Sequence, residues 1–141
     1  MTMLSRPILL IEDNPMDIDL TQRAFKERHL GNAVIVVRDG QEALDYFAAW
    51  KEGDPLPVVI LLDLQLPKVH GLDVLRAIKK TTIFQKLPVV VLTSSAEDRD
   101  INTAYELGAN SYIVKPVDFD KFTDVAAQIE IYWLAINHPP K

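Results

Sequence analysis

The chain has no cysteine among its 141 residues. This absence excludes disulfides, thiolate catalysis and zinc sites built on cysteine, and it suits a reducing cytoplasm. No apolar run approaches the ~18 residues that a membrane span needs. The N-terminal apolar stretch, Pro7 to Ile11, is short and ends in two acidic residues, unlike a secretory signal. The formal net charge of −5 disfavours nucleic acid, whose phosphates would be repelled. We therefore expect a soluble cytoplasmic protein without nucleic-acid or membrane partners.

What the chain does have is apolar content: 48% of its residues are hydrophobic. That fraction is enough to build one core without covalent or metal staples. The length is that of one ordinary domain. We expect residues 1–141 to form a single domain with no second domain attached.

Five short apolar runs alternate with amphipathic stretches, which is typical of a parallel sheet covered by helices on both faces. Several of the runs are apolar throughout, as expected for strands that are buried on both sides. The pattern predicts an α/β fold of the (βα)5 type. The predicted strands are Ile8–Ile11, Ala33–Val37, Val58–Leu62, Val89–Leu92 and Ser111–Val114.

The intervening segments carry helix start and stop signals. Asn14 followed by Pro15 predicts a capped helix that runs to about His29. Gly31 is expected to terminate it in the manner of a C-terminal glycine. Asp118 is expected to open the last helix. Helical periodicity predicts inward-facing side chains that include Met16, Leu20, Thr21, Ala24, Phe25, Ile101, Ala104, Tyr105, Phe122, Val125, Ala126 and Ile129.

Polar residues follow four of the five predicted strands. They are Glu12-Asp13, Asp63, Thr93-Ser94 and Lys115-Pro116. Each alone is explained as a turn residue, a helix cap or a solvated lysine. Because the carboxyl ends of parallel strands meet at one edge of the sheet, however, the fold brings all four together.

Three converging carboxylates repel one another unless a cation compensates them. Magnesium is the natural partner, since it takes one or two carboxylates together with waters and phosphate oxygens. With Lys115 as a second positive charge, the cluster predicts phosphoryl transfer, in which a carboxylate attacks in line. Asp63, on the central strand, is the candidate nucleophile. Thr93 is one strand away and can place its hydroxyl on a phosphoryl oxygen.

These motifs resemble the receiver domains of bacterial response regulators, the family that includes the chemotaxis response regulator. The resemblance covers Pro7 to about Asn137. It implies a flavodoxin-like fold with strand order 2-1-3-4-5, a sensor histidine kinase as phosphoryl donor, and a phosphoacceptor switch rather than an enzyme that turns over a separate substrate. The segments that carry it are Ile8 to Asn14, Leu61 to Gly71, Val91 to Ser94 and Lys115-Pro116.

The resemblance also implies a metal set. Asp13 and Asp63 would ligate magnesium, Gln65 would contribute its backbone carbonyl, and Glu12 would act mostly through a metal-bound water. Gln65 and Ser95 stand at positions that vary in the family and influence the lifetime of the phosphoryl group.

Further roles implied by the resemblance concern the phosphoryl group itself. Lys115 would bind it, and the bond from Lys115 to Pro116 would be cis. Thr93 and Tyr112 would form a switch pair, in which the hydroxyl moves toward the phosphate and the ring moves inward behind it. An ordinary buried tyrosine is the alternative for Tyr112.

Within the family, the chain looks most like the small regulators paired with bacterial and cyanobacterial phytochromes. The segments behind this second resemblance are Asp13 to Asp17, Ala43 to Phe47, the long loop that follows, and Tyr132 to Leu134.

The expected last helix is apolar around most of its circumference from Ile129 to Ile136. A helix that covers one sheet face needs only one apolar stripe, and a larger apolar surface marks a contact site. With no effector domain expected, we predict a homodimer around the fourth strand, fifth strand and last helix. Its centre would be Ile131, Tyr132, Trp133 and Leu134. Alternatives are that these side chains cover the domain's own edge, and that output passes to a downstream phosphotransfer protein.

Three other functions are alternatives to the response-regulator function. A haloacid-dehalogenase-type phosphatase usually needs a second aspartate where this chain has Gln65. A flavodoxin-like FMN binder needs a phosphate-cradling loop where this chain has Glu12-Asp13, which would repel the phosphate. A receiver-like binding module that works without phosphorylation is the third.

Overall fold

The computed structural model describes residues 6–29, 31–116, 118–130 and 133. Within them, strands and helices alternate along the chain. All five predicted strands are present, with ends shifted by at most one residue. In order, the elements are β1 (Ile8–Ile11), α1 (Pro15–Glu27), β2 (Val34–Val37), α2 (Gly40–Ala49), β3 (Val59–Leu62), α3 (Gly71–Lys80), β4 (Val89–Thr93), α4 (Asp98–Glu106), β5 (Ser111–Val114) and α5 (Phe119–Ile129).

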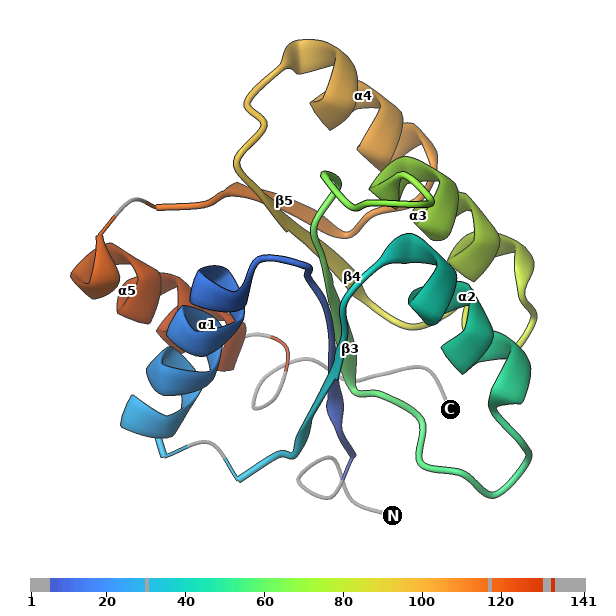
Figure 1. Ribbon diagram of the computed structural model, residues 1–141, viewed down its shortest axis with the longest axis horizontal. Helices are drawn as coiled ribbons and strands as arrows, with labels where there is room; N and C mark the ends of the chain where they lie inside the picture. The colour runs from blue at the N-terminus through green and yellow to red at the C-terminus, as the bar shows by residue number, and fades with distance from the viewer. Residues whose placement is uncertain (1–5, 30, 117, 131–132, 134–141) are drawn as a thin grey trace.

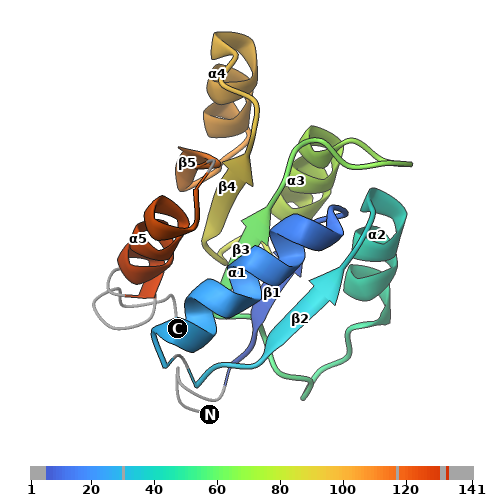
Figure 2. The ribbon, with the colours of Figure 1, turned by 60° about the vertical axis from the view of Figure 1, so that its left-hand side comes forward.

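The strands form one parallel sheet in the order β2-β1-β3-β4-β5, which confirms the predicted fold. Helices α1 and α5 lie side by side on one face, while α2, α3 and α4 cover the other (Figures 1 and 2). The register pairs Ile11 with Leu62, so β1 and β3 end level with each other. The residues that follow these two strands therefore emerge at the same edge of the sheet.

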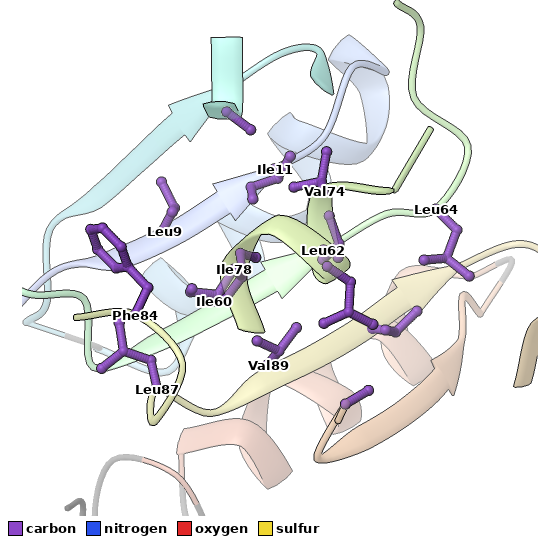
Figure 3. Close-up of a cluster of buried hydrophobic side chains, with 14 of the residues drawn as sticks. Leu9, Ile11, Ile60, Leu62, Leu64, Val74, Ile78, Phe84, Leu87 and Val89 are labelled. Atoms are coloured by element: carbon purple, nitrogen blue, oxygen red, sulfur yellow. The ribbon is translucent and has the colours of Figure 1, made fainter. Parts of the chain in front are cut away.

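The side chains of the central strands alternate between two apolar clusters, one on each face of the sheet. The cluster beneath α2, α3 and α4 contains Leu9, Ile11, Ile60, Leu62, Val89 and Phe84 (Figure 3). The cluster beneath α1 and α5 contains Ile8, Leu10, Val59, Leu61, Val90 and Phe122. Strands β1, β3 and β4 are buried along their whole length, as predicted from sequences that are apolar throughout except for Thr93 at the end of β4.

The predicted helix starts are confirmed. The Asn14 side chain accepts hydrogen bonds from the backbone N–H groups of Met16 (2.9 Å) and Asp17 (3.2 Å), and the Asp118 side chain accepts one from Lys121 N–H (2.9 Å). These bonds satisfy amide donors that lack partners inside the helix.

Two expectations about the helices are wrong. After α1 the left-handed residue is His29, with φ 56°, and not Gly31, because a non-glycine residue can adopt this conformation at modest cost. Met16 and Tyr105 point outward, with 80% and 49% of their surface exposed. Helical periodicity allows more than one apolar stripe, and the buried stripe of α1 is Ile18, Thr21, Ala24 and Phe25.

The C-terminal apolar segment is described only in part. Trp133 is half-buried and packs against the cluster beneath α1 and α5. For this residue, the alternative of covering the domain's own edge is the one observed. Ile131, Tyr132 and Leu134 lie outside the described residues. In the part of the chain that is described, no helix is long and apolar enough to cross a membrane.

Candidate functional site

The carboxylates predicted to converge do so at the carboxyl edge of the sheet. Oxygens of Glu12, Asp13 and Asp63 lie within 4.8 Å of one another. The shared register of β1 and β3 explains this proximity, since Asp63 N–H donates to Ile11 O (3.0 Å), the carbonyl that directly precedes Glu12. Glu12 N–H donates in turn to Val37 O on β2 (3.0 Å). Glu12 and Asp63 are buried, so their charges are costly unless they are compensated.

Lys115 provides that compensation. It follows β5, and its side chain is only 9% exposed. Its Nζ lies 2.5 Å from Glu12 Oε1, 2.8 Å from Asp17 Oδ2 and 2.9 Å from Asp63 Oδ2. A lysine ammonium has three N–H donors, and each has a carboxylate partner here. Burial alone would lower the pKa of Lys115, but bonds from Asp17, Glu12 and Asp63 outweigh it and raise the pKa above the usual value. The ammonium therefore stays charged.

The two buried carboxyls respond differently to this ammonium. Burial raises the pKa of Glu12 to about 7, against the lowering effect of its hydrogen bond with Lys115 and with a further rise from the Asp63 charge. Burial would also raise the pKa of Asp63, but the hydrogen bonds from Lys115 and from Gln65 N–H (3.1 Å) hold that pKa below its usual value. Asp63 is therefore the more acidic carboxyl of the pair and is ionised at neutral pH.

The cluster fits a divalent cation. The Lys115 ammonium contacts the carboxylates of Glu12, Asp17 and Asp63, and the carboxylate of Asp13 lies close to those of Glu12 and Asp63. One ammonium does not balance the charge of several converging carboxylates, and such carboxylates repel one another without a further cation. Carboxylate oxygens are the ligands that magnesium prefers.

Gly71 shapes the loop that follows Asp63. A Cβ atom at this position would lie 2.4 Å from Leu64 Cα and 2.5 Å from Asp63 O, so only glycine fits. Gly71 N–H donates to Leu64 O (2.9 Å) and ties the start of α3 to the end of β3. In the same loop, the Gln65 side-chain oxygen accepts a bond from Ser94 Oγ (2.5 Å). The backbone carbonyl of Gln65 as a metal ligand stays a prediction.

Thr93 and Tyr112 both contact Ser95, in the loop between β4 and α4. The buried Thr93 Oγ1 accepts a long bond from Ser95 N–H (3.5 Å), and Tyr112 OH donates to Ser95 O (2.9 Å). Ser95 Oγ in turn donates to Asp100 Oδ2 (2.6 Å). The two members of the predicted switch pair are thus joined through one loop residue, although their switching roles stay a prediction.

The expected cis bond before Pro116 is wrong. The described residues contain no cis peptide bond, so Lys115–Pro116 is trans. A trans X–Pro bond is intrinsically favoured by about 0.5–1 kcal/mol. Lys115 reaches its three carboxylates with this bond trans, so these ion pairs do not require the less favourable isomer.

Asp17 is the site residue that sequence reasoning missed. It lies in the first turn of α1 rather than at a strand end, where an acidic residue is readily explained by the helix dipole. The available signal was its position four residues after Asp13, on a helix that starts at the same sheet edge.

Comparison with known proteins agrees with this geometry. The family model of the response regulator receiver domain matches residues 8–127, and the chain belongs to that family. It is 42% identical over 134 residues to the probable methanogenesis regulatory protein FilR2 of Methanothrix harundinacea, covering 94% of this chain and 86% of that protein.

Three solved structures are also similar. The phosphorylated cyanobacterial phytochrome response regulator RcpA has a TM-score of 0.89 and 37% identity, over 97% of this chain and 99% of its own. The Mn²⁺-bound form of Rcp1, from Synechocystis, has a TM-score of 0.87 and 36% identity, over 96% and 99%. The bacteriophytochrome response regulator RtBRR has a TM-score of 0.73 and 49% identity, over 96% and 84%. The chain is thus a response regulator receiver of phosphorylation-based two-component signalling.

Proposed function

We propose that the chain is a phosphoacceptor switch that takes a phosphoryl group onto Asp63 from a sensor histidine kinase. The observation that carries this proposal is the contact of Lys115 Nζ with Asp63, inside a cluster of carboxylates. An ionised nucleophile, a fixed cation and a metal-binding set in one place are the parts that phosphoryl transfer requires.

In the reaction, one Asp63 carboxylate oxygen attacks the phosphorus atom and an O–P bond forms. The bond from phosphorus to the donor's histidine nitrogen breaks, and its electron pair stays on the imidazole. Lys115, already 2.9 Å from Asp63 Oδ2, donates hydrogen bonds to the arriving phosphoryl oxygens. The domain assists this one transfer and the later hydrolysis, and it acts on no separate substrate.

Glu12, Asp13, Asp63 and the backbone carbonyl of Gln65 would hold magnesium. A bound Mg²⁺ supplies positive charge that neutralises the phosphoryl oxygens. The chemistry of the carboxylate set supports this assignment, as does the Mn²⁺ bound in the structure of Rcp1.

The signal leaves the site through Thr93 and Tyr112. When the Thr93 hydroxyl moves to a phosphoryl oxygen, it loses the hydrogen bond from Ser95 N–H. The carbonyl of Ser95 accepts the hydrogen bond from Tyr112 OH. Rearrangement of this loop is therefore coupled to the position of the Tyr112 ring.

The direct test is phosphorylation followed by mapping. We expect a labile gain of one phosphoryl group (~80 Da) when the protein is incubated with Mg²⁺ and acetyl phosphate. Borohydride reduction and peptide mass analysis should place it on Asp63. A phytochrome-type histidine kinase should also serve as donor, since RcpA and RtBRR are named as phytochrome-associated regulators. A folded wild type that gains no mass would favour the phosphorylation-independent binding module.

Output is proposed to use a cytoplasmic homodimer around β4, β5 and α5, or contact with a downstream phosphotransfer protein. Strand β5 is at the edge of the sheet, and Val114 on it is 44% exposed. An apolar edge strand is a natural pairing surface. Tyr132, Leu134 and Ile131 remain part of this prediction.

Val114→Lys tests the dimer. Side chains alternate along a strand, so residue 114 points away from Lys115 and the substitution leaves the site intact. We expect sedimentation of the wild type at tens of micromolar to show a dimer, and Val114→Lys to shift it to monomer because two buried ammonium groups would face each other. Ile83→Lys, at a similarly exposed apolar residue away from β5, is the matched control and should stay dimeric. A monomeric wild type would rule the dimer out.

A further inference from the structure

Asp17 contacts the site lysine from outside the metal-binding carboxylates. Its Oδ2 lies 2.8 Å from Lys115 Nζ. Among the described residues, the carboxylates that gather within 4.8 Å of one another are those of Glu12, Asp13 and Asp63, and Asp17 is not one of them. It is also more open to solvent, with 28% of its side chain exposed.

The backbone holds Asp17 in a defined place. Its N–H donates to the Asn14 side chain (3.2 Å), and its carbonyl accepts a hydrogen bond from the hydroxyl of the buried Thr21 (2.8 Å). Pro15 opens the same helical turn. A carboxylate on a capped helical turn is positioned more accurately than one on a loop.

The three partners of Lys115 differ in what happens to them during phosphorylation. Glu12 and Asp63 are carboxylates that would coordinate a divalent cation, and Asp63 also becomes the phosphorylated group. Both partners are therefore committed elsewhere when the ammonium is needed at a phosphoryl oxygen. Asp17 is the partner that takes no part in either event.

We propose that Asp17 is a positioning residue: it holds Lys115 Nζ beside Asp63 while Glu12 and Asp63 turn to the metal and the phosphoryl group. Without it, the ammonium depends on the same two carboxylates that the metal uses, and the metal and the lysine compete for them. With it, the ammonium keeps one fixed partner within reach of the transferred group. This inference rests on the proposed function and adds a residue to it.

The test is the initial rate of phosphorylation by acetyl phosphate at saturating Mg²⁺, followed by intact-protein mass. Simple electrostatics and positioning predict opposite changes in the phosphorylation rate when the Asp17 charge is removed. Removing a negative charge near an anionic donor should speed the reaction, whereas losing the anchor of Lys115 should slow it. We expect Asp17→Asn to be slower by about fivefold, which is within the range of measured pair couplings. Asp17→Glu, which keeps the charge, should recover part of the rate.

Two further variants separate positioning from a general charge effect. Asp19→Asn makes the same change on the same helix, at a residue that pairs with Arg23 on the surface, and should stay within about twofold of wild type. In a Lys115→Met background, Asp17→Asn should change the remaining rate by less than about twofold, because the group it positions is gone.

If Asp17→Asn is phosphorylated as fast as the wild type, or is slowed by the same factor with and without Lys115, the positioning role of Asp17 is wrong and the proposed function is unaffected. A wild type that is never phosphorylated would overturn the proposed function as well.

Discussion

Asp63→Asn is expected to abolish phosphorylation. The amide keeps the shape of the carboxylate, but it carries no negative charge and has no nucleophilic oxygen available for attack on phosphorus. Loss of an attacking group costs several orders of magnitude in rate. In the intact-mass assay with Mg²⁺ and acetyl phosphate, the phosphoryl gain of the wild type should fall below detection.

The matched control for this substitution is Asp19→Asn, which removes one exposed carboxylate from α1 and should be phosphorylated like the wild type. Thermal melting should show that both variants are folded. A phosphoryl gain that persists in Asp63→Asn would mean that another residue is the acceptor, and it would contradict the assignment of Asp63.

Lys115→Met is expected to cause the largest loss of stability among substitutions in the site. The change leaves Glu12 and Asp63 buried without their cation. Removing one partner of a buried ion pair typically costs about 3–5 kcal/mol. In metal-free buffer at about pH 8, urea unfolding should show a reduction of the free energy of unfolding of that order.

This loss should depend on pH, with a defined sign. Without Lys115, the pKa of Glu12 rises above its present value of about 7, and the pKa of Asp63 rises from its lowered value. A carboxyl whose folded pKa is raised binds more protons in the folded than in the unfolded state, so stability increases as pH falls. The destabilisation should therefore be largest at about pH 8 and shrink toward about pH 5. Mg²⁺ should also restore part of it, because a ligand of the folded state stabilises that state.

Lys79→Met is the control for the pH and metal effects. Lys79 is a half-buried lysine whose Nζ donates to the carbonyls of Gln85 (3.1 Å) and Leu87 (3.2 Å), with no carboxylate among these partners. Its loss should destabilise by an amount that changes little with pH or Mg²⁺. If Lys115→Met behaves in the same way, unpaired carboxylates are not the source of its cost.

The fold was predictable from sequence because its signals are local and repeated. Strands buried on both faces are almost wholly apolar, and helices α1 and α5 follow Asn14 and Asp118, whose side chains cap the first helical turn. Most of the site was predictable for a related reason. In a parallel sheet, residues that follow strands share one edge, which brings Glu12, Asp63 and Lys115 together from distant parts of the chain.

What the sequence could not decide depends on contacts between elements. Periodicity does not say which stripe of a helix meets the sheet, so Met16 was expected inside and lies outside. The isomer of the Lys115–Pro116 bond depends on packing around it, which local sequence does not contain. Asp17 belongs to the site only because the first turn of α1 lies beside Lys115, which follows β5. The sequence by itself determined the fold and the meeting of Glu12, Asp63 and Lys115 at one edge of the sheet, since both follow from the order of the strands and the residues at their ends. The tertiary structure decided which carboxylates share the ammonium, because that depends on distances between side chains far apart in sequence.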